Sequence, residues 1–296
     1  MRWERRSRRG DVIDARGGGM RPRSGLPMGK AGAGGAVGIV GLIVYLLISQ
    51  LGGGGGTSFG VDSGFPSDAP SAPDARSIPA AQDPERDLRD FSAYVFSEAQ
   101  DTWAETFARS NRRYDRAQLV LYRDAVSTGC GGASSAVGPF YCSADQRVYL
   151  DLSFYGDMER ELGAGGDFAW AYVIAHEIGH HVQNQLGTSR EVRNLQSQNP
   201  GDANQLSVRL ELQADCYSGV WAKTVYEAGD LAEGDVREAI GASEAVGDDR
   251  LQRRATGSVN PDSFTHGSSE QRARWFNEGR ATGDPGACNT FSAEEL

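Results

Sequence analysis

The sequence predicts an α+β fold that is dominated by helices, contains a small β-sheet and is preceded by one transmembrane helix. Three observations lead to this prediction. Residues 31–51 carry no charged side chain, the runs 117–122 and 147–152 are short and strand-like, and longer stretches repeat apolar residues at three- and four-residue steps. With 296 residues, of which 39% are hydrophobic, the chain can form one sizeable folded unit with appendages.

Charge is distributed unevenly along the chain. Residues 1–30 carry nine basic and three acidic side chains, whereas the remainder carries 21 basic and 37 acidic ones. The uncharged stretch 31–51 is long enough to span a bilayer as a helix. Basic flanks favour the cytoplasm. We therefore expect a single-pass protein of the cell membrane, with a cytoplasmic head (1–30), a transmembrane helix (31–51) and an extracytoplasmic remainder.

Two other interpretations of this N-terminal part fit less well. A cleaved signal peptide conflicts with the long polar head and the lack of a clear A-x-A site. A nucleic-acid-binding arm would also be basic, but attraction to anionic lipid head groups explains a basic head beside an apolar span more simply. No nucleic-acid motif is evident in the rest of the chain, so no nucleic-acid partner is expected.

Residues 52–86 shift in composition to Gly, Ser, Pro, Ala and Asp, which predicts a flexible linker. The folded domain is expected to span 87–296. A long amphipathic helix opens it, because apolar residues recur there at helical spacing: Leu88, Phe91, Val95, Ala99, Trp103 and Phe107.

A second helix is predicted over 168–186, with Asp167 as its N-cap and Gly187 as its end. It contains the motif HExxH at His176–His180. Residues i and i+4 share one face of a helix, so both imidazoles can reach one tetrahedral zinc ion. Glu177 lies beside them, where it can take a proton from a metal-bound water. The alternative is two ordinary polar histidines on a helix.

A catalytic zinc ion normally has three protein ligands, and a third predicted helix, 203–228, offers one. Glu211 and Asp215 lie one turn apart on it and face the same way. Glu211 suits the third ligand, and Asp215 suits the carboxylate that accepts the free N–H of a ligand histidine. The alternative is that both are surface carboxylates. We expect one Zn²⁺ per chain.

These motifs resemble those of gluzincin metallopeptidases, in which a Glu-xx-Ala-Asp helix follows HExxH. More narrowly, the chain is similar to the bacterial family called putative neutral zinc metallopeptidases, or YpfJ-like. The matching stretches are 1–3, 138–142, 148–152, 176–181, 210–216 and 265–272. The resemblance implies a zincin-like domain that cleaves a peptide or protein substrate. It also implies a substrate-pairing strand near the motif helix, for which we favour 148–152.

The resemblance implies a role for His266, which stands in a loop before a helix predicted over 268–279. It would donate a hydrogen bond to the tetrahedral intermediate. The alternative is a histidine that holds the loop or caps the last helix. His181 points about 100° away from His180 around the helix, so we interpret it as structural.

The four cysteines contain no CxxC pair, and their even number favours disulfides outside the cytoplasm. Three pairings are open. We favour Cys130 with Cys142, which are near in sequence and bracket one loop, and Cys216 with Cys288.

From the motifs and the resemblance we therefore expect a membrane-anchored zinc metallopeptidase. Two rival interpretations are a different zinc amidohydrolase, such as a deformylase-like enzyme with a cysteine ligand, and a non-catalytic envelope scaffold held by zinc. A structural zinc site has no need of Glu177, which favours catalysis. The sequence does not determine the oligomeric state.

Overall fold

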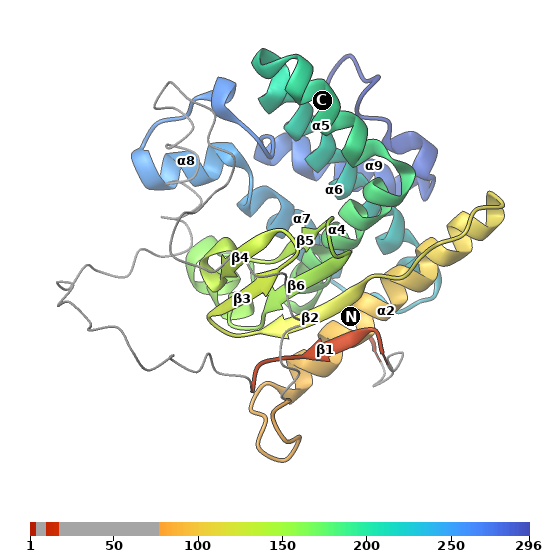
Figure 1. Cartoon of the computed structure of the whole chain (residues 1–296), viewed down its shortest axis with the longest axis vertical. Coiled ribbons are helices and arrows are strands. Elements are labelled where there is room, and N and C mark those ends of the chain that lie inside the picture. The colour runs from red at the N-terminus through yellow and green to blue at the C-terminus, as the bar shows by residue number, and fades with distance from the viewer. Residues whose placement is uncertain (4–9, 18–76) are drawn as a thin grey trace.

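The computed structural model describes residues 1–3, 10–17 and 77–296, and shows strands beneath a layer of helices (Figure 1). The strands are β1 (Val12–Asp14), β2 (Gln118–Tyr122), β3 (Ala125–Thr128), β4 (Gly131–Ser134), β5 (Phe140–Cys142) and β6 (Arg147–Asp151). The helices are α2 (Arg86–Arg109), α3 (Phe154–Asp157), α4 (Asp167–Leu186), α5 (Thr188–Gln198), α6 (Ala203–Glu227), α7 (Asp235–Ala245), α8 (Asp248–Thr256) and α9 (Ser269–Thr282). The prediction of a helix-dominated α+β fold is confirmed.

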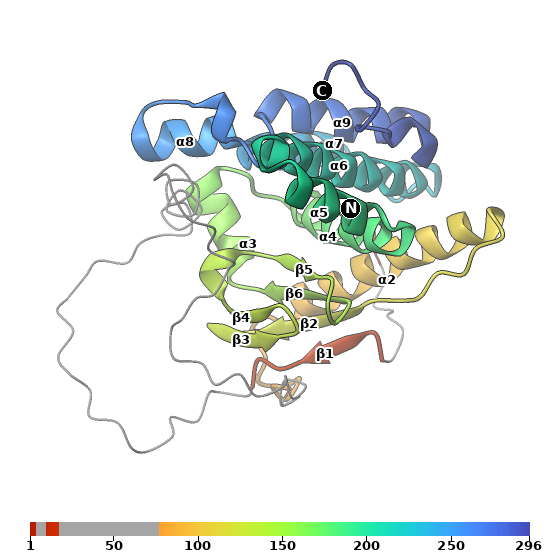
Figure 2. The ribbon, with the colours of Figure 1, turned by 45° about the horizontal axis from the view of Figure 1, so that its top comes forward.

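The main sheet has the strand order β1-β2-β6-β5, in which only β5 runs antiparallel to its neighbour. Alternate side chains of a strand point to opposite faces. One face therefore joins the helical core through Leu119, Leu121, Val148 and Leu150. The other face packs against the β3–β4 hairpin through Val120, Tyr122 and Tyr149. Figure 2 shows α4 over the sheet and α6, α7 and α9 over α4.

Helices α6 and α9 approach each other closely at two glycines. A Cβ atom on Gly279 would lie 1.9 Å from the carbonyl oxygen of Cys216, and one on Gly219 would lie 2.1 Å from that of Phe276. Any larger residue would force the two backbones apart. The contact fixes α6, which carries Glu211 and Asp215, against the last helix.

The N-terminal part of the chain packs on the same domain. β1 pairs in parallel with β2. Arg16 is buried against the equally buried Asp83, with Nη2 2.6 Å from Oδ2. The sequence predicts a folded domain from residue 87 and a separate head over 1–30; in the structure, residues 10–17 and Asp83 pack on that domain.

The predicted transmembrane helix, 31–51, lies outside the described residues, as does most of the predicted linker. Within the part of the chain that is described, no helix is both long enough and apolar enough to cross a membrane. The predicted boundaries at residues 30 and 51 lie outside it as well.

The predicted start of α4 needs a correction. The helix does end at Leu186, and Gly187 follows with a φ of 88°. Its N-cap, however, is Gly166, and Asp167 makes no capping hydrogen bond. Asp167 instead accepts a hydrogen bond of 2.9 Å from the α-amino group of Met1. The side chain of Asp167 therefore pairs with the α-amino group of Met1 instead of capping the helix.

The prediction that residues 148–152 pair with substrate is wrong for Val148 and Tyr149, which lie in β6 between β2 and β5. The pairing with β5 ends at Tyr149, so for residues 150–152 the substrate-pairing role stays a prediction. Among the described strands, β5 ends the sheet and leaves one edge unpaired. The favoured disulfides are both confirmed, Cys130–Cys142 and Cys216–Cys288.

Candidate metal centre

Three side chains from two helices meet at one point. His176 and His180 lie one turn apart on α4, and Glu211 reaches them from α6. Glu211 Oε2 is 3.2 Å from His176 Nε2, and Glu211 Oε1 is 3.4 Å from His180 Nε2. Tetrahedral zinc holds N and O ligands at about 2.0–2.2 Å, which places neighbouring ligand atoms roughly 3.3–3.6 Å apart. The donor set is one that zinc prefers, and its ligand atoms all lie within 4.8 Å of one another.

The electrostatics of this point favour a cation. Burial acts to lower the pKa of His176, but Asp215 and Glu211 outweigh it and raise that pKa to about 10. Burial alone would raise the pKa of Glu211, yet His180 and His176 hold that pKa well below its usual range. The carboxylates that raise the pKa of His176 favour positive charge at this point, and a bound metal ion would take the place of the proton on Nε2.

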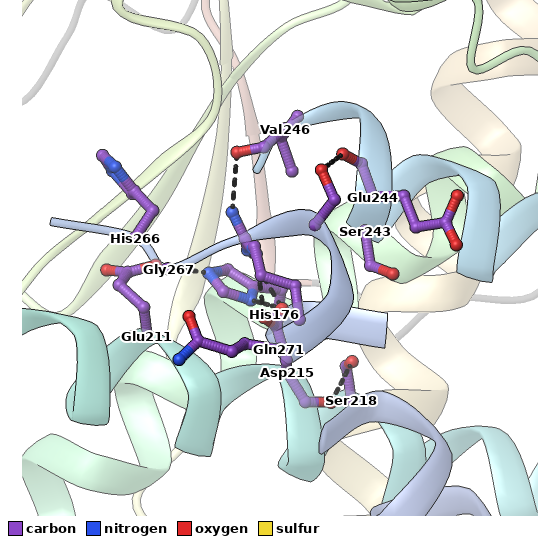
Figure 3. Close-up of polar contacts among 12 residues, drawn as sticks. His176, Glu211, Asp215, Ser218, Ser243, Glu244, Val246, His266, Gly267 and Gln271 are labelled. Atoms are coloured by element: carbon purple, nitrogen blue, oxygen red, sulfur yellow. Dashed lines mark hydrogen bonds and ion pairs between the residues drawn. The ribbon is translucent and has the colours of Figure 1, made fainter. Parts of the chain in front are cut away.

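Asp215 lies next to the imidazole of His176 (Figure 3). Its Oδ1 lies 2.8 Å from His176 Nδ1. The carboxylate is completely buried and also accepts hydrogen bonds from Arg272 and from the hydroxyl of Tyr172. Burial would raise the pKa of Asp215, but Arg272 and His176 outweigh it and lower the pKa. The ionised carboxylate holds the N–H on Nδ1 and leaves Nε2 of His176 facing Glu211.

Glu177 lines the same cleft as the three candidate ligands. It is only 7% exposed. Burial raises its pKa against the opposing effects of His180 and His176. The backbone of Tyr141, in β5, also acts to lower this pKa. A carboxylate with a raised pKa is suited to accept a proton during a reaction.

His266 lines the cleft as well, on a loop held by Asp248. One oxygen of Asp248 accepts hydrogen bonds from the backbone N–H groups of Thr265, His266 and Gly267, at 2.7, 2.7 and 3.1 Å. The other oxygen lies 3.2 Å from His266 Nδ1. Figure 3 shows His266 on the side of the site from which Glu211 approaches. Asp248 thus orients the imidazole of His266 through Nδ1.

His181 does not belong to the cluster of candidate ligands formed by His176, His180 and Glu211. It is completely buried, with Nε2 2.7 Å from the carbonyl oxygen of Asp115 and Nδ1 2.9 Å from the hydroxyl of Tyr141. Asn184 donates a second hydrogen bond to that hydroxyl. His181 and Asn184 therefore tie the edge strand β5 to α4 and keep Tyr141 beside Glu177.

The cleft over these residues has a volume of about 450 Å³. Its wall combines the candidate ligands with side chains of β5, α3, α5 and α9. No cysteine thiolate competes as a ligand, because all four cysteines of the chain form disulfides. This excludes the cysteine ligand of a deformylase-like site.

Comparison with known proteins agrees with this geometry. The family model described as "Putative neutral zinc metallopeptidase" matches residues 1–291. The chain belongs to this family. "Uncharacterized protein YpfJ" of Escherichia coli strain K12 is 44% identical over 297 residues, which cover 98% of this chain and 99% of that protein. "Uncharacterized protein Mb2605" of Mycobacterium bovis is 47% identical over 194 residues, 62% of this chain and 65% of that protein. No solved structure matches.

For this member of the zinc metallopeptidase family, the structure brings together every site residue that the sequence singles out: His176, Glu177, His180, Glu211, Asp215 and His266. Their roles stay predictions. Sequence reasoning missed Asp248 and Arg272. Arg272 lies in the stretch 265–272 that carries the family resemblance, and Asp248 directly follows Gly247 at a helix start. For neither residue does the neighbouring sequence indicate the distant group to which it bonds.

Proposed function

We propose that the protein is a zinc-dependent peptidase that hydrolyses peptide bonds, with Glu177 as the general base. One observation carries the proposal: His176, His180 and Glu211 converge in a cleft that Glu177 and His266 also line. The match to a zinc metallopeptidase family supports the metal and the reaction class.

The residues of the chain have separable tasks in this reaction. Zinc, when bound by His176, His180 and Glu211, supplies a Lewis acid and lowers the pKa of a coordinated water toward about 7. Glu177 accepts a proton from the attacking water and returns it to the leaving amine. His266, oriented by Asp248, donates a hydrogen bond to the developing oxyanion.

The edge strand β5 supports a peptide as the substrate. Phe140 and Tyr141 line the cleft, and the outer edge of β5 is unpaired among the described strands. An extended peptide can add to such an edge through backbone hydrogen bonds. A small amide has no extended backbone that could pair with this strand.

Attachment to a membrane is a further part of the proposal. It rests on the uncharged stretch 31–51. The competing interpretation, a zinc-held scaffold without activity, needs neither Glu177 nor a cleft beside the metal.

The test compares the full chain with Glu177→Gln, produced under oxidising conditions and with zinc content measured on both. The substitution keeps the shape of the side chain and removes its capacity to accept a proton. We expect equal zinc content and a loss of at least about 100-fold in cleavage of an unfolded-protein and peptide panel. Cleavage by the zinc-loaded variant at the wild-type rate would refute the role of Glu177. If neither protein cleaves although both hold zinc, the scaffold interpretation is favoured.

A further inference from the structure

The cleft has two chemically different ends along α4. Val173, His176, Glu177 and His180 share one face of the helix, and a rise of about 1.5 Å per residue puts Val173 and His180 roughly 10 Å apart along the axis. At the Val173 end the wall is apolar and includes Phe154, whose ring lies 6.3 Å from that of Trp170. His176 and His180, the candidate zinc ligands on α4, therefore lie between this apolar end and the part of the cleft beyond His180.

Helix α5 forms the other end. It begins directly after Gly187, and its residues Ser189 and Arg193 line the cleft. They are four residues apart and so lie on one face of α5. Ser189 is buried and Arg193 is exposed. A hydroxyl and a guanidinium, one helical turn apart, thus belong to the part of the cleft wall that α5 forms.

The charge of Arg193 is available for a ligand. Within the described part of the chain, Arg193 forms no hydrogen bond or ion pair with another residue. Among the residues that line the cleft, Glu177 and Glu211 are the only acidic ones, and both belong to the proposed chemistry. Arg272, the other cleft arginine, is committed to Asp215.

This local charge contrasts with the rest of the molecule. Residues 31–296 carry 21 basic and 37 acidic side chains, so Arg193 puts a positive charge on the wall of a cleft in an otherwise acidic part of the chain. Guanidinium groups bind carboxylates through paired, charge-assisted hydrogen bonds, which a neighbouring hydroxyl can extend.

The geometry points to carboxylate recognition: Arg193, with Ser189, selects peptides that place a carboxylate on the α5 side of the scissile bond. The carboxylate belongs to an Asp or Glu side chain or to the C-terminus of the peptide. This inference rests on the proposed peptidase function and names its substrate class.

The experiment uses the zinc-loaded full chain and sets of peptides that differ only in Glu, Gln or Lys at positions on each side of the cleaved bond. Each peptide is made with a free and with an amidated C-terminus, which separates the two sources of the carboxylate. The variants are Arg193→Glu and, as the matched control, Arg190→Glu. Arg190 is also exposed on α5 but does not line the cleft.

We expect wild type to favour the carboxylate-bearing peptide over its neutral counterpart by about tenfold in kcat/KM, mostly through KM, as one hydrogen bond to a charged group allows. Arg193→Glu should reverse the preference toward Lys, whereas Arg190→Glu should keep it. A preference that survives Arg193→Glu, or its absence in wild type while neutral peptides are cut, overturns the inference and leaves the peptidase function standing.

A binding measurement tests the inference without turnover. Calorimetry of the same peptides on zinc-loaded Glu177→Gln, with and without Arg193→Glu, should show the same dependence on the carboxylate. If binding shows it but no peptide is cut by wild type, the inference stands and the peptidase function fails. Equal binding of charged and neutral peptides overturns the inference.

Discussion

At the scale of single residues, the site depends on charges that are buried in pairs. Asp215 has no exposure to solvent, and its charge is balanced by Arg272 and by the N–H of His176. Removing one partner of a buried pair leaves an uncompensated charge, which costs more than the pair contributes. Because Asp215 bonds both His176 and Arg272, a change at this pair should affect the metal site and the free energy of unfolding together.

Arg272→Met tests this coupling. It should lower the free energy of unfolding by about 3–5 kcal/mol, because it leaves Asp215 buried without its main counter-charge. Urea unfolding at neutral pH with excess zinc measures the change. Arg274→Met is the matched control: Arg274 is exposed on the same helix and should cost within about 0.5 kcal/mol. Equal losses in the two variants would show that the pair has no such role.

The parts of the site that the sequence predicts are those with a local signal. His176, Glu177 and His180 follow from helical spacing, and Glu211 and Asp215 from a second helical spacing. Asp248 was not predicted, because its bonds reach the loop 265–267, and such a contact depends on the fold. The same holds for Arg272, which meets Asp215 from another helix.

At the scale of elements, position within the fold decides what a strand or a helix can do. Four helices, α2, α4, α6 and α9, were predicted to within a few residues because their apolar periodicity is local: α6, expected over 203–228, spans Ala203–Glu227. The shorter helices α3, α5, α7 and α8 were not predicted. The order of the strands was not predictable, since pairing joins segments far apart in the chain. β1 was missed for that reason and because it has only three residues.

The close contact of α6 and α9 gives a prediction at this scale. Gly279→Ala should destabilise the domain by about 1–3 kcal/mol, because the new Cβ meets the backbone of α6 and forces an overpacked contact. The matched control is Gly241→Ala in α7, where a Cβ meets no atom within 4 Å. It should stabilise by about 0.5–1 kcal/mol through helix propensity. Urea unfolding compares the two, and a neutral Gly279→Ala would contradict the close approach.

At the scale of the whole molecule, the packing of the N-terminal part bears on membrane orientation. β1 pairs with β2, and Arg16 is buried on Asp83. In this fold residues 10–17 therefore pack on the domain that 77–296 forms. The orientation with a cytoplasmic head and an extracytoplasmic domain stays a prediction, and it requires these contacts to open.

Cysteine labelling tests the orientation. Gly17→Cys and Ser258→Cys each introduce one thiol at an exposed position, and the native cysteines are all in disulfides. If the contacts of residues 10–17 persist in a membrane, a membrane-impermeant maleimide should label both variants from the same side of intact cells or inverted vesicles. Labelling from opposite sides would show that the head leaves the domain when the protein is in a membrane.

The central claim is that His176, His180 and Glu211 hold one zinc ion. The most direct measurement is zinc stoichiometry after dialysis of the wild type and Glu211→Ala, with Glu191→Ala, an exposed carboxylate on α5, as the control. The account predicts about one zinc per chain for the wild type and the control and a large loss for Glu211→Ala, since a catalytic site needs its third protein ligand. Full zinc retention by Glu211→Ala would contradict it.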